Sequence, residues 1–387
     1  VPDSSWVAHI EPSAVSPGSA LVAFDAHRTG DRESLIVWTD NYGRDWRRIG
    51  RRSDLEGFVH TVEQDAIVED LLFAGTEAGL YVSLNRGEDW FKWTHGLPPV
   101  PVHDLTLHPR DHDLVIATHG RAAYVLDDIR PLRELARNPR RNEFELFLFE
   151  PPPAFIRGTP SSDRDGRSAV DATPRGQDRP PGVLLTYWLG AGLSGGRDDR
   201  DDSEDRVGDA GEGRPAVTVE ILDFEGRVVR TLSGPAVPGV NRIAWDLRED
   251  PPTPSGPLGE FADVVNADEG GLRSADVLPG SFTVRISREG AESVQSLEVR
   301  TDARVDIDMV ERIAKYQAVK RGLDLDVRLR ALRAAIASVH NELQRVAAWV
   351  GDRGFAGDVA LLETSQSLGD ELTELADFRS VLRYRPG

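Results

Sequence analysis

The sequence contains no cysteine, one methionine and few lysines. Without cysteine, disulfide bonds, thiolate catalysis and zinc sites with cysteine ligands are excluded. Lysine supplies only Lys92, Lys315 and Lys320 of the 46 basic residues, a bias typical of a GC-rich genome or a salt-adapted host. No apolar run approaches the roughly 18 residues of a membrane-spanning helix, so the sequence predicts no transmembrane helix.

A basic surface is also missing. The net charge is −19, whereas nucleic-acid-binding proteins normally present a basic face, so nucleic acid is not an expected partner. The 387 residues suffice for two or three domains with cores of their own. Because the chain begins at Val1 and its only methionine is Met309, we expect it to be the back end of a larger protein.

A repeat organises the first third of the chain. Ser83–Trp90 repeats Thr39–Trp46 at a distance of 44 residues, and Val102–Val125 repeats Val59–Val82 at a distance of 43. This period, with its alternating apolar residues, is the length of a four-stranded β-propeller blade. Residues 1–149 are therefore predicted to form the last blades of a propeller. Because a ring needs about four to eight blades, we expect the remaining ones upstream of residue 1 or in another chain.

Two of these repeats carry an Asp-box-like turn. We expect its small polar residue and glycine to close the hairpin between the third and fourth strands of a blade. The tryptophan at its end is expected to be largely buried between neighbouring blades. The residues assigned this structural role are Thr39, Asn41, Gly43, Trp46, Ser83, Asn85, Gly87 and Trp90.

The middle of the chain predicts a second β domain. Residues 150–180 are rich in Pro, Ser, Arg and Asp and indicate a linker. Residues 181–303 predict an antiparallel β-sandwich, interrupted by an acidic, disordered loop at 190–215. The alternation of Ile243, Trp245 and Leu247 puts these side chains on one face, with Trp245 in the core. The expected strands are 183–189, 216–223, 227–232, 241–247, 281–287 and 293–300.

Residues 304–387 predict an α-helical hairpin that folds back antiparallel. The first helix has an apolar heptad seam, which is typical of helix packing. We expect Gly351, Gly354 and Gly357 to end it and a second amphipathic helix to follow. The seam residues are Leu325, Leu329, Leu332, Ile336, Val339, Leu343, Val346 and Val350, and the second stripe is Leu361, Leu368, Leu372, Leu375 and Leu382. The predicted fold class is thus mainly β: a partial β-propeller, an Ig/FnIII-like β-sandwich and a C-terminal helical hairpin.

The geometry of a blade indicates which residues face a ligand. Successive turns of a meander lie at opposite ends, so the turns between strands two and three lie opposite the Asp boxes. Glu77, His119 and Arg121 are on those turns and are candidates for a ligand face. His60 and His103 occupy equivalent inner-strand positions and are candidates for lining the channel. The alternative is that all five only stabilise turns and strands.

No complete catalytic or metal motif appears. A glycosidase needs a carboxylate pair on one rim, and no motif pairs the available Glu63, Asp65, Glu77 and Asp104. A sialidase needs an arginine cluster and a tyrosine nucleophile; Arg110 and Arg121 do not make that cluster, and Tyr81 and Tyr124 lie in predicted strands. The sequence has no EF-hand or zincin spacing, so it predicts no metal site and no cofactor.

Several segments resemble a known family. They are the two boxes, Ala74–Ser83, His108–Asp111, Thr118–Arg121, Leu126–Asp128, Val217–Arg248 and Leu278–Phe282. Together they resemble the sortilin-like, BNR-repeat "glycosyl hydrolase" proteins of bacteria and archaea. The resemblance implies a propeller followed by a sandwich and terminal helices, in a large exported protein that is extracellular or periplasmic.

These observations lead to one main hypothesis and two alternatives. The main one is an exported, non-catalytic module that binds a peptide, protein or glycan through the end of the blades or their channel. The first alternative is a glycoside hydrolase, sialidase-like or of another Asp-box type, with its catalytic residues mostly on upstream blades. The second is a structural assembly module that makes contacts through its helices.

Overall fold

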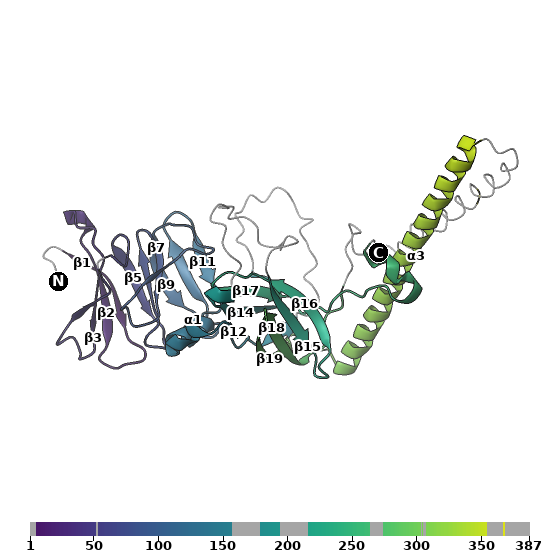
Figure 1. Ribbon diagram of the computed structural model, residues 1–387. Helices are drawn as coiled ribbons and strands as arrows, with labels where there is room; N and C mark the ends of the chain where they lie inside the picture. Colours follow the sequence, from purple (N-terminus) through teal and green to yellow (C-terminus); the bar gives the residue numbers. More distant parts are fainter. Residues whose placement is uncertain are drawn as a thin grey trace, which may run out of the picture.

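The protein is described here by a computed structural model. The described residues are 5–51, 53–156, 179–193, 216–263, 274–302, 304, 307–353 and 367. They form a mainly β structure of five sheets followed by one long helix, α3 (Met309–Arg353) (Figure 1). Three sheets lie side by side at the N-terminal end, and two more form a second unit in the middle of the molecule.

The three N-terminal sheets are antiparallel meanders whose strands follow one another in chain order. This is the order that the repeat predicts, and within the described part of residues 57–126 there is no helix. The first sheet contains β1 (Trp6–Pro12), β2 (Ala20–Asp25), β3 (Leu35–Thr39) and β4 (Arg47–Ile49), with a short 3₁₀ helix, η1 (His27–Thr29), between β2 and β3. The second contains β5 (Val59–Gln64), β6 (Leu72–Thr76), β7 (Gly79–Ser83) and β8 (Phe91–Trp93), and the third β9 (Val102–Leu107), β10 (Leu114–Thr118) and β11 (Ala123–Leu126).

The two box turns have the same hydrogen bonds. In the first box the Thr39 hydroxyl accepts the backbone N–H of Gly43 at 3.0 Å, and Asn41 Oδ1 accepts that of Asp45 at 2.9 Å. In the second, Ser83 and Asn85 accept the N–H groups of Gly87 and Asp89 at 2.8 and 2.9 Å. Both glycines have a positive φ, 77° and 81°, which only glycine adopts without strain. The predicted structural role of the boxes therefore has a definite hydrogen-bond basis.

The two box tryptophans differ in burial. Trp90 is 8% exposed, as predicted, and its indole lies against Gly50 at the end of the preceding sheet. Trp46 is 46% exposed, so the prediction that both are largely buried is wrong for this residue. The reason is that a box tryptophan packs against the sheet before its own, and among the described residues no sheet precedes β1–β4.

A helix closes the third sheet in place of a fourth strand. α1 (Arg130–Arg137) packs Leu132 and Ala136 into the core shared by the second and third sheets, and η2 (Pro139–Glu143) follows it. Arg133 pairs with the fully buried Asp65 at 2.7 Å. Because breaking a buried ion pair leaves a charge without a partner, this contact fixes α1 against the second sheet.

The second unit consists of two sheets around one core. The smaller sheet has the order β12 (Leu146–Leu148), β14 (Val183–Leu189) and β17 (Gly239–Trp245). The larger has the order β13 (Ala154–Ile156), β19 (Ala291–Thr301), β18 (Gly280–Arg288), β15 (Val217–Leu222) and β16 (Val228–Gly234). Buried residues of both sheets belong to a single cluster. Two short 3₁₀ helices, η4 (Ala191–Leu193) and η5 (Gly256–Phe261), lie in its connections.

Two strands of this unit lie outside the predicted domain limits. β12 falls within the segment 1–149 assigned to the blades, and β13 falls within the predicted linker 150–180. β13 also pairs parallel to β19, so the unit is not wholly antiparallel. Both strands have only three residues, too few for alternation to identify them. The remainder of the linker, 157–178, and positions 194–215 of the acidic loop lie outside the described residues.

The two units are joined by a buried arginine on β17. The Arg242 guanidinium donates to the backbone carbonyls of Asp127 and Asp128 at 2.7 and 2.9 Å, and to the Thr186 hydroxyl at 3.0 Å. These carbonyls come directly after β11, so one side chain ties the third sheet to the smaller sheet of the second unit.

The long helix ends later than predicted. α3 runs through Gly351 to Arg353, beyond the glycine expected to end it, and it extends away from the sheets (Figure 1). Its buried residues are Val327 and Ala331, whereas the seam residues Leu325 and Leu329 are 58% and 47% exposed. The prediction that the seam packs is therefore wrong for these positions. The second helix of the hairpin lies outside the described residues.

Burial of Trp245 generates a stability prediction. Its side chain is fully buried, its ring contacts Phe282, and its indole N–H donates to the Arg248 carbonyl at 2.9 Å. We expect Trp245→Ala to lower the free energy of unfolding by roughly 3–5 kcal/mol, because a large cavity and an unpaired carbonyl remain. Trp46→Ala is the matched control and is expected to cost no more than about 1 kcal/mol. Equal effects of the two variants in chemical denaturation would contradict this assignment of the core.

Candidate ligand-binding face

The candidate residues lie at the end of the sheets opposite the Asp boxes. In each meander the inner strand begins at this end, and the turn between the second and third strands returns to it. His60 and His103 lie near the beginning of β5 and β9. Glu77 is on the β6–β7 turn, and His119 is on the β10–β11 turn. The structure thus brings together four of the five residues that the sequence analysis selected.

A row of five aromatic rings crosses this end. The rings of His27 and Phe58 stack at 4.5 Å between centroids, and Phe58 meets His60 edge-on at 4.8 Å. His60 stacks on His103 at 4.1 Å, and His103 on His119 at 5.2 Å. These five residues are called the ring row below. It extends over all three sheets.

A β-bulge explains the position of each central histidine. In the β5–β6 pairing, Val59 and Thr61 lie opposite two consecutive residues, Thr76 and Gly75. His60, between them, is therefore the extra residue of the bulge. On β9, Val102 and Asp104 oppose consecutive residues of β10 in the same way, which makes His103 the extra residue. A bulge bends its strand and redirects a side chain, and this is how equivalent histidines of two sheets come to face each other.

Glu77 is the acidic partner of the row. Its Oε2 lies 3.1 Å from His60 Nε2, and one ligand atom each of His60, Glu77 and His103 lie within 4.8 Å of one another. The backbone N–H of Glu77 donates to the Phe58 carbonyl at 3.2 Å, and that of His119 donates to the Pro101 carbonyl at 2.9 Å. Each turn is therefore bonded to the backbone just before an inner strand, which fixes the side chains relative to one another.

The surroundings of His103 favour the neutral state of its ring. Partial burial lowers the pKa of His103 below its ordinary value, and the nearby His60 and His119 lower it further, while Glu77 opposes them. Two imidazolium ions stacked at 4.1 Å would repel each other. His103 therefore favours a neutral ring, while Nε2 of His60 is paired with the half-exposed Glu77 carboxylate.

Arg121, the fifth residue selected from the sequence, does not belong to the ring row. Two residues of the row were not selected from the sequence. Arg121 is exposed on the same turn as His119 and makes no side-chain hydrogen bond within the described residues. His27 and Phe58 belong to the row but precede the repeated positions. His27 lies at the start of η1 in the irregular β2–β3 connection, and its Nδ1 lies 2.5 Å from Asp25 Oδ2. No repeat signal marks either residue, so only the three-dimensional packing reveals them.

A second polar group lies further along the inner strands. Glu63 on β5 accepts the backbone N–H of Leu107 on β9 at 3.1 Å. Burial raises the pKa of Glu63 to about 7, and the carboxylates of Glu11 and Asp104 raise it as well. Burial also raises the pKa of Glu11. The inner strands thus hold a carboxyl group that is half protonated near neutral pH, a property that general acids of glycosidases share.

Other residues considered for catalysis are occupied elsewhere. Asp65 is fully buried in its pair with Arg133, so it is not available to a substrate. Tyr81 is 3% exposed within β7, and Arg110 pairs with its neighbour Asp111 at 2.9 Å.

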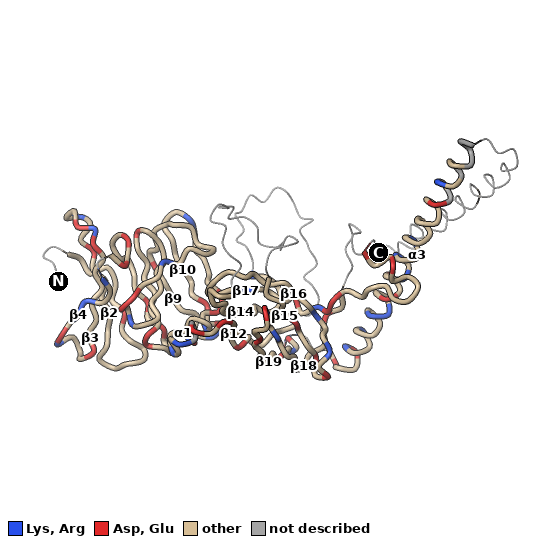
Figure 2. The backbone as a smooth tube through the Cα atoms, in the orientation of Figure 1, with Lys and Arg blue, Asp and Glu red and all other residues tan. Residues whose placement is uncertain are grey.

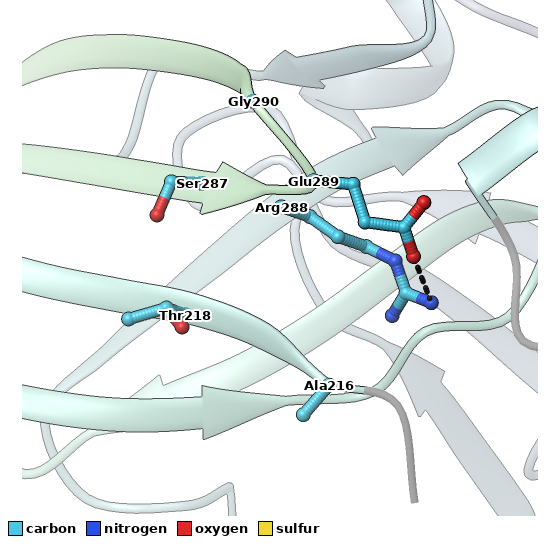
Figure 3. A pocket seen from close by; sticks show the side chains of 6 residues that line it. All are labelled: Ala216, Thr218, Ser287, Arg288, Glu289 and Gly290. Carbon is cyan, nitrogen blue, oxygen red and sulfur yellow. Dashed lines mark ion pairs between the residues drawn. The ribbon is translucent and has the colours of Figure 1, made fainter.

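A small cavity in the second unit is a separate candidate for a ligand-binding site. It has a volume of about 320 Å³ and lies where β15 begins and β18 ends (Figure 3). Arg288 lines it with a side chain that is 4% exposed, and Nη2 lies 3.4 Å from Glu289 Oε1. Within the described part of the chain, Nε and Nη1 of Arg288 have no hydrogen-bond partner. Ala216 on its wall directly follows the undescribed residues 194–215, so the described residues supply only part of its surroundings.

Charged residues of both signs are distributed along the described part of the chain. Figure 2 shows acidic and basic residues interleaved along the N-terminal sheets, the second unit and α3. Of the helices that the structure describes, none is both long and apolar enough to cross a membrane.

Comparisons with known proteins give distant similarities. No protein-family model and no curated protein matches the chain. The GH74 enzyme of Niastella koreensis is 14% identical over 32% of this chain and 21% of its own, with a TM-score of 0.28. YCF48 bound to D1 peptide is 13% identical over 33% of this chain and 38% of its own, with a TM-score of 0.25.

PorZ, a surface component of the type-IX secretion system of Porphyromonas gingivalis, is 13% identical over 75% of this chain and 38% of its own, with a TM-score of 0.25. The chain therefore spans well under two thirds of each of these proteins. All three are propeller-type β proteins. The scores are too low for their activities to say anything about this chain.

The raised pKa of Glu63 predicts a pH-dependent stability. A carboxyl whose pKa is raised by folding stabilises the fold fully below its ordinary value of 4.5, and this contribution is lost as the pH rises through about 7. Glu63→Gln keeps an oxygen for the Leu107 N–H but cannot ionise. We therefore expect the variant to have a higher Tm than the unchanged protein at pH 8 and a similar Tm at pH 4.5.

Glu88→Gln is the matched control for this prediction. Glu88 is an exposed residue of the second box, remote from the inner-strand carboxylates. Its substitution is expected to change Tm equally at both pH values. A Glu63→Gln effect that is independent of pH would show that repulsion between the carboxylates does not raise the pKa of Glu63.

Proposed function

We propose that the chain belongs to an exported, non-catalytic β-propeller protein of the Asp-box type. In this proposal it binds a peptide, protein or glycan through the ring row. The three N-terminal sheets are consecutive blades, and the second unit is an Ig/FnIII-like sandwich. The single observation that carries the binding role is the ring row itself, an ordered array of stacked rings from three sheets with the exposed carboxylate of Glu77 beside its centre.

Exposed apolar residues on the first sheet support the idea that the ring continues. On β1, Trp6, Val7 and Ile10 are 45%, 54% and 58% exposed, and Trp46 of the same sheet is 46% exposed. The equivalent surface of the second sheet, including Trp90, is buried against the first. An apolar blade surface without a neighbour is costly in water, so further blades are the proposed cover for it.

The chemistry of the row fits an uncharged or cationic ligand group. The rings cover one another's faces where they stack, so the exposed His103 and His119 offer ring edges and their nitrogens to hydroxyl or amide groups of a ligand. Glu77 is half exposed and accepts hydrogen bonds from hydroxyl, amide or amino groups. Because the rings are already stacked, binding requires little loss of side-chain entropy.

A binding experiment tests this role. The purified chain is screened on peptide and glycan arrays, and the affinity of the best probes is measured for His103→Ala and for His108→Ala. His108 follows β9 at the opposite end of the same sheet and is the matched control. We expect at least a tenfold loss for His103→Ala, corresponding to about 1.4 kcal/mol, and no change for His108→Ala. Equal losses, or no specific probe on either array, would contradict the proposal.

The glycoside hydrolase remains the second candidate because of one observation. Glu63 has a pKa of about 7 and lies close to Glu11 and Asp104, and a protonated acid beside a carboxylate is what such an enzyme needs. In the proposed function these groups have no catalytic role, since a complete rim requires further blades.

The two candidates predict different results in a hydrolysis assay. We expect no turnover of aryl glycosides or aryl sialosides by this chain over the pH range 4–8. Turnover that disappears in Glu63→Gln or Glu77→Gln, and persists in Glu88→Gln, would overturn the non-catalytic assignment.

A further inference from the structure

The centre of the ring row combines three groups that bind transition metals. His60 Nε2 lies 3.1 Å from Glu77 Oε2, and a ring nitrogen of His103 completes a set in which the ligand atoms lie within 4.8 Å of one another. The three residues come from β5, the β6–β7 turn and β9, so no short sequence motif joins them. This is why the sequence analysis, which looked for fixed spacings, predicted no metal site.

The distances suit a small ion. In a tetrahedral zinc site with ligand bonds of about 2.0–2.2 Å, neighbouring ligand atoms are about 3.3 Å apart. The His60–Glu77 pair already has this separation. His103 and Glu77 are exposed, so rotation about their side-chain bonds can close the remaining gap and turn the His103 ring out of its stack on His60 until its nitrogen lone pair points at the ion. Two imidazoles and one carboxylate favour zinc or its neighbours in the transition series over calcium or magnesium, which prefer oxygen ligands.

The surroundings hold the ligands in place and leave one side open. Phe58 covers one side of the His60 ring, and His119 stacks on His103 from the other direction. The two turn–strand backbone bonds described above, from Glu77 and His119, fix the β6–β7 and β10–β11 turns. A site with three protein ligands keeps a fourth position for water or an external donor.

We propose that His60, Glu77 and His103 bind a divalent transition-metal ion, zinc by preference, with an open coordination position that faces solvent at the end of the blades. This deepens the proposed function, on which it rests for its role: the ion would give the ring row a direct contact to a carboxylate, hydroxyl or imidazole of the ligand. Binding of the ion itself involves only the three side chains of this chain.

Zinc titration of the whole chain tests the proposal. After treatment with EDTA and buffer exchange, the chain is titrated with ZnCl₂ in a calorimeter, and CoCl₂ is used to record the visible spectrum. We expect saturable binding with one ion per chain, and a cobalt spectrum of a four-coordinate site. His103→Ala and Glu77→Gln, both exposed positions, are expected to weaken the affinity at least tenfold, whereas His108→Ala leaves it unchanged.

Each other result has a definite meaning. The absence of saturable zinc binding, or zinc binding of equal strength in His103→Ala, Glu77→Gln and His108→Ala, would overturn the metal site. Array binding by the EDTA-treated chain would then leave the proposed function intact. Zinc binding with the expected variant pattern, together with arrays that reveal no ligand in the presence or absence of zinc, would support the metal site and contradict the proposed function.

Discussion

The close approach of the three inner strands is the constraint on which the candidate face depends. β5 lies between β1 and β9, and Gly75 on β6 shows how tight the spacing is. A Cβ atom at that position would lie 2.6 Å from the Val102 carbonyl oxygen, so only glycine fits without a shift. Exposed strand edges carry unpaired backbone groups, and here the side chain of Glu63 accepts the Leu107 N–H on the neighbouring strand. The same approach brings the rings of His60 and His103 into contact.

The repeat in the sequence predicted most of the N-terminal strands, because a period of 43–44 residues and the two box motifs leave one arrangement of four strands per repeat. It also placed His60, Glu77, His103 and His119 at one end. It could not show that the two inner histidines stack, because this depends on a bulge in each strand. The first sheet has the same bulge at Ala8, where no ring is present, and His27 and Phe58 extend the row instead.

Other differences between sequence and structure have equally local causes. Asp65 and Glu63 are both acidic residues near the end of β5, and the sequence offered both as candidates. Asp65 is buried in its pair with Arg133, a residue 68 positions away, so a ligand cannot reach it. The side chain of Glu63 is partly exposed to solvent. The heptad seam of α3 follows a regular spacing, yet Val327 and Ala331 are the buried positions. Periodicity identified the helix but not the face that packs, since that face is chosen by η5 and Glu249, which contact α3 from the second unit.

The polar residues of the inner strands are compatible with this tight packing because few of them carry a full charge. The raised pKa of Glu63, about 7, lets it retain a proton near neutral pH, and the lowered pKa of His103 favours a neutral ring. Had all of these groups been ionised, carboxylates on adjacent strands and imidazolium ions in van der Waals contact would repel one another in a partly buried setting. In a chain with a net charge of −19, the lower charge along the inner strands is thus a condition for their approach.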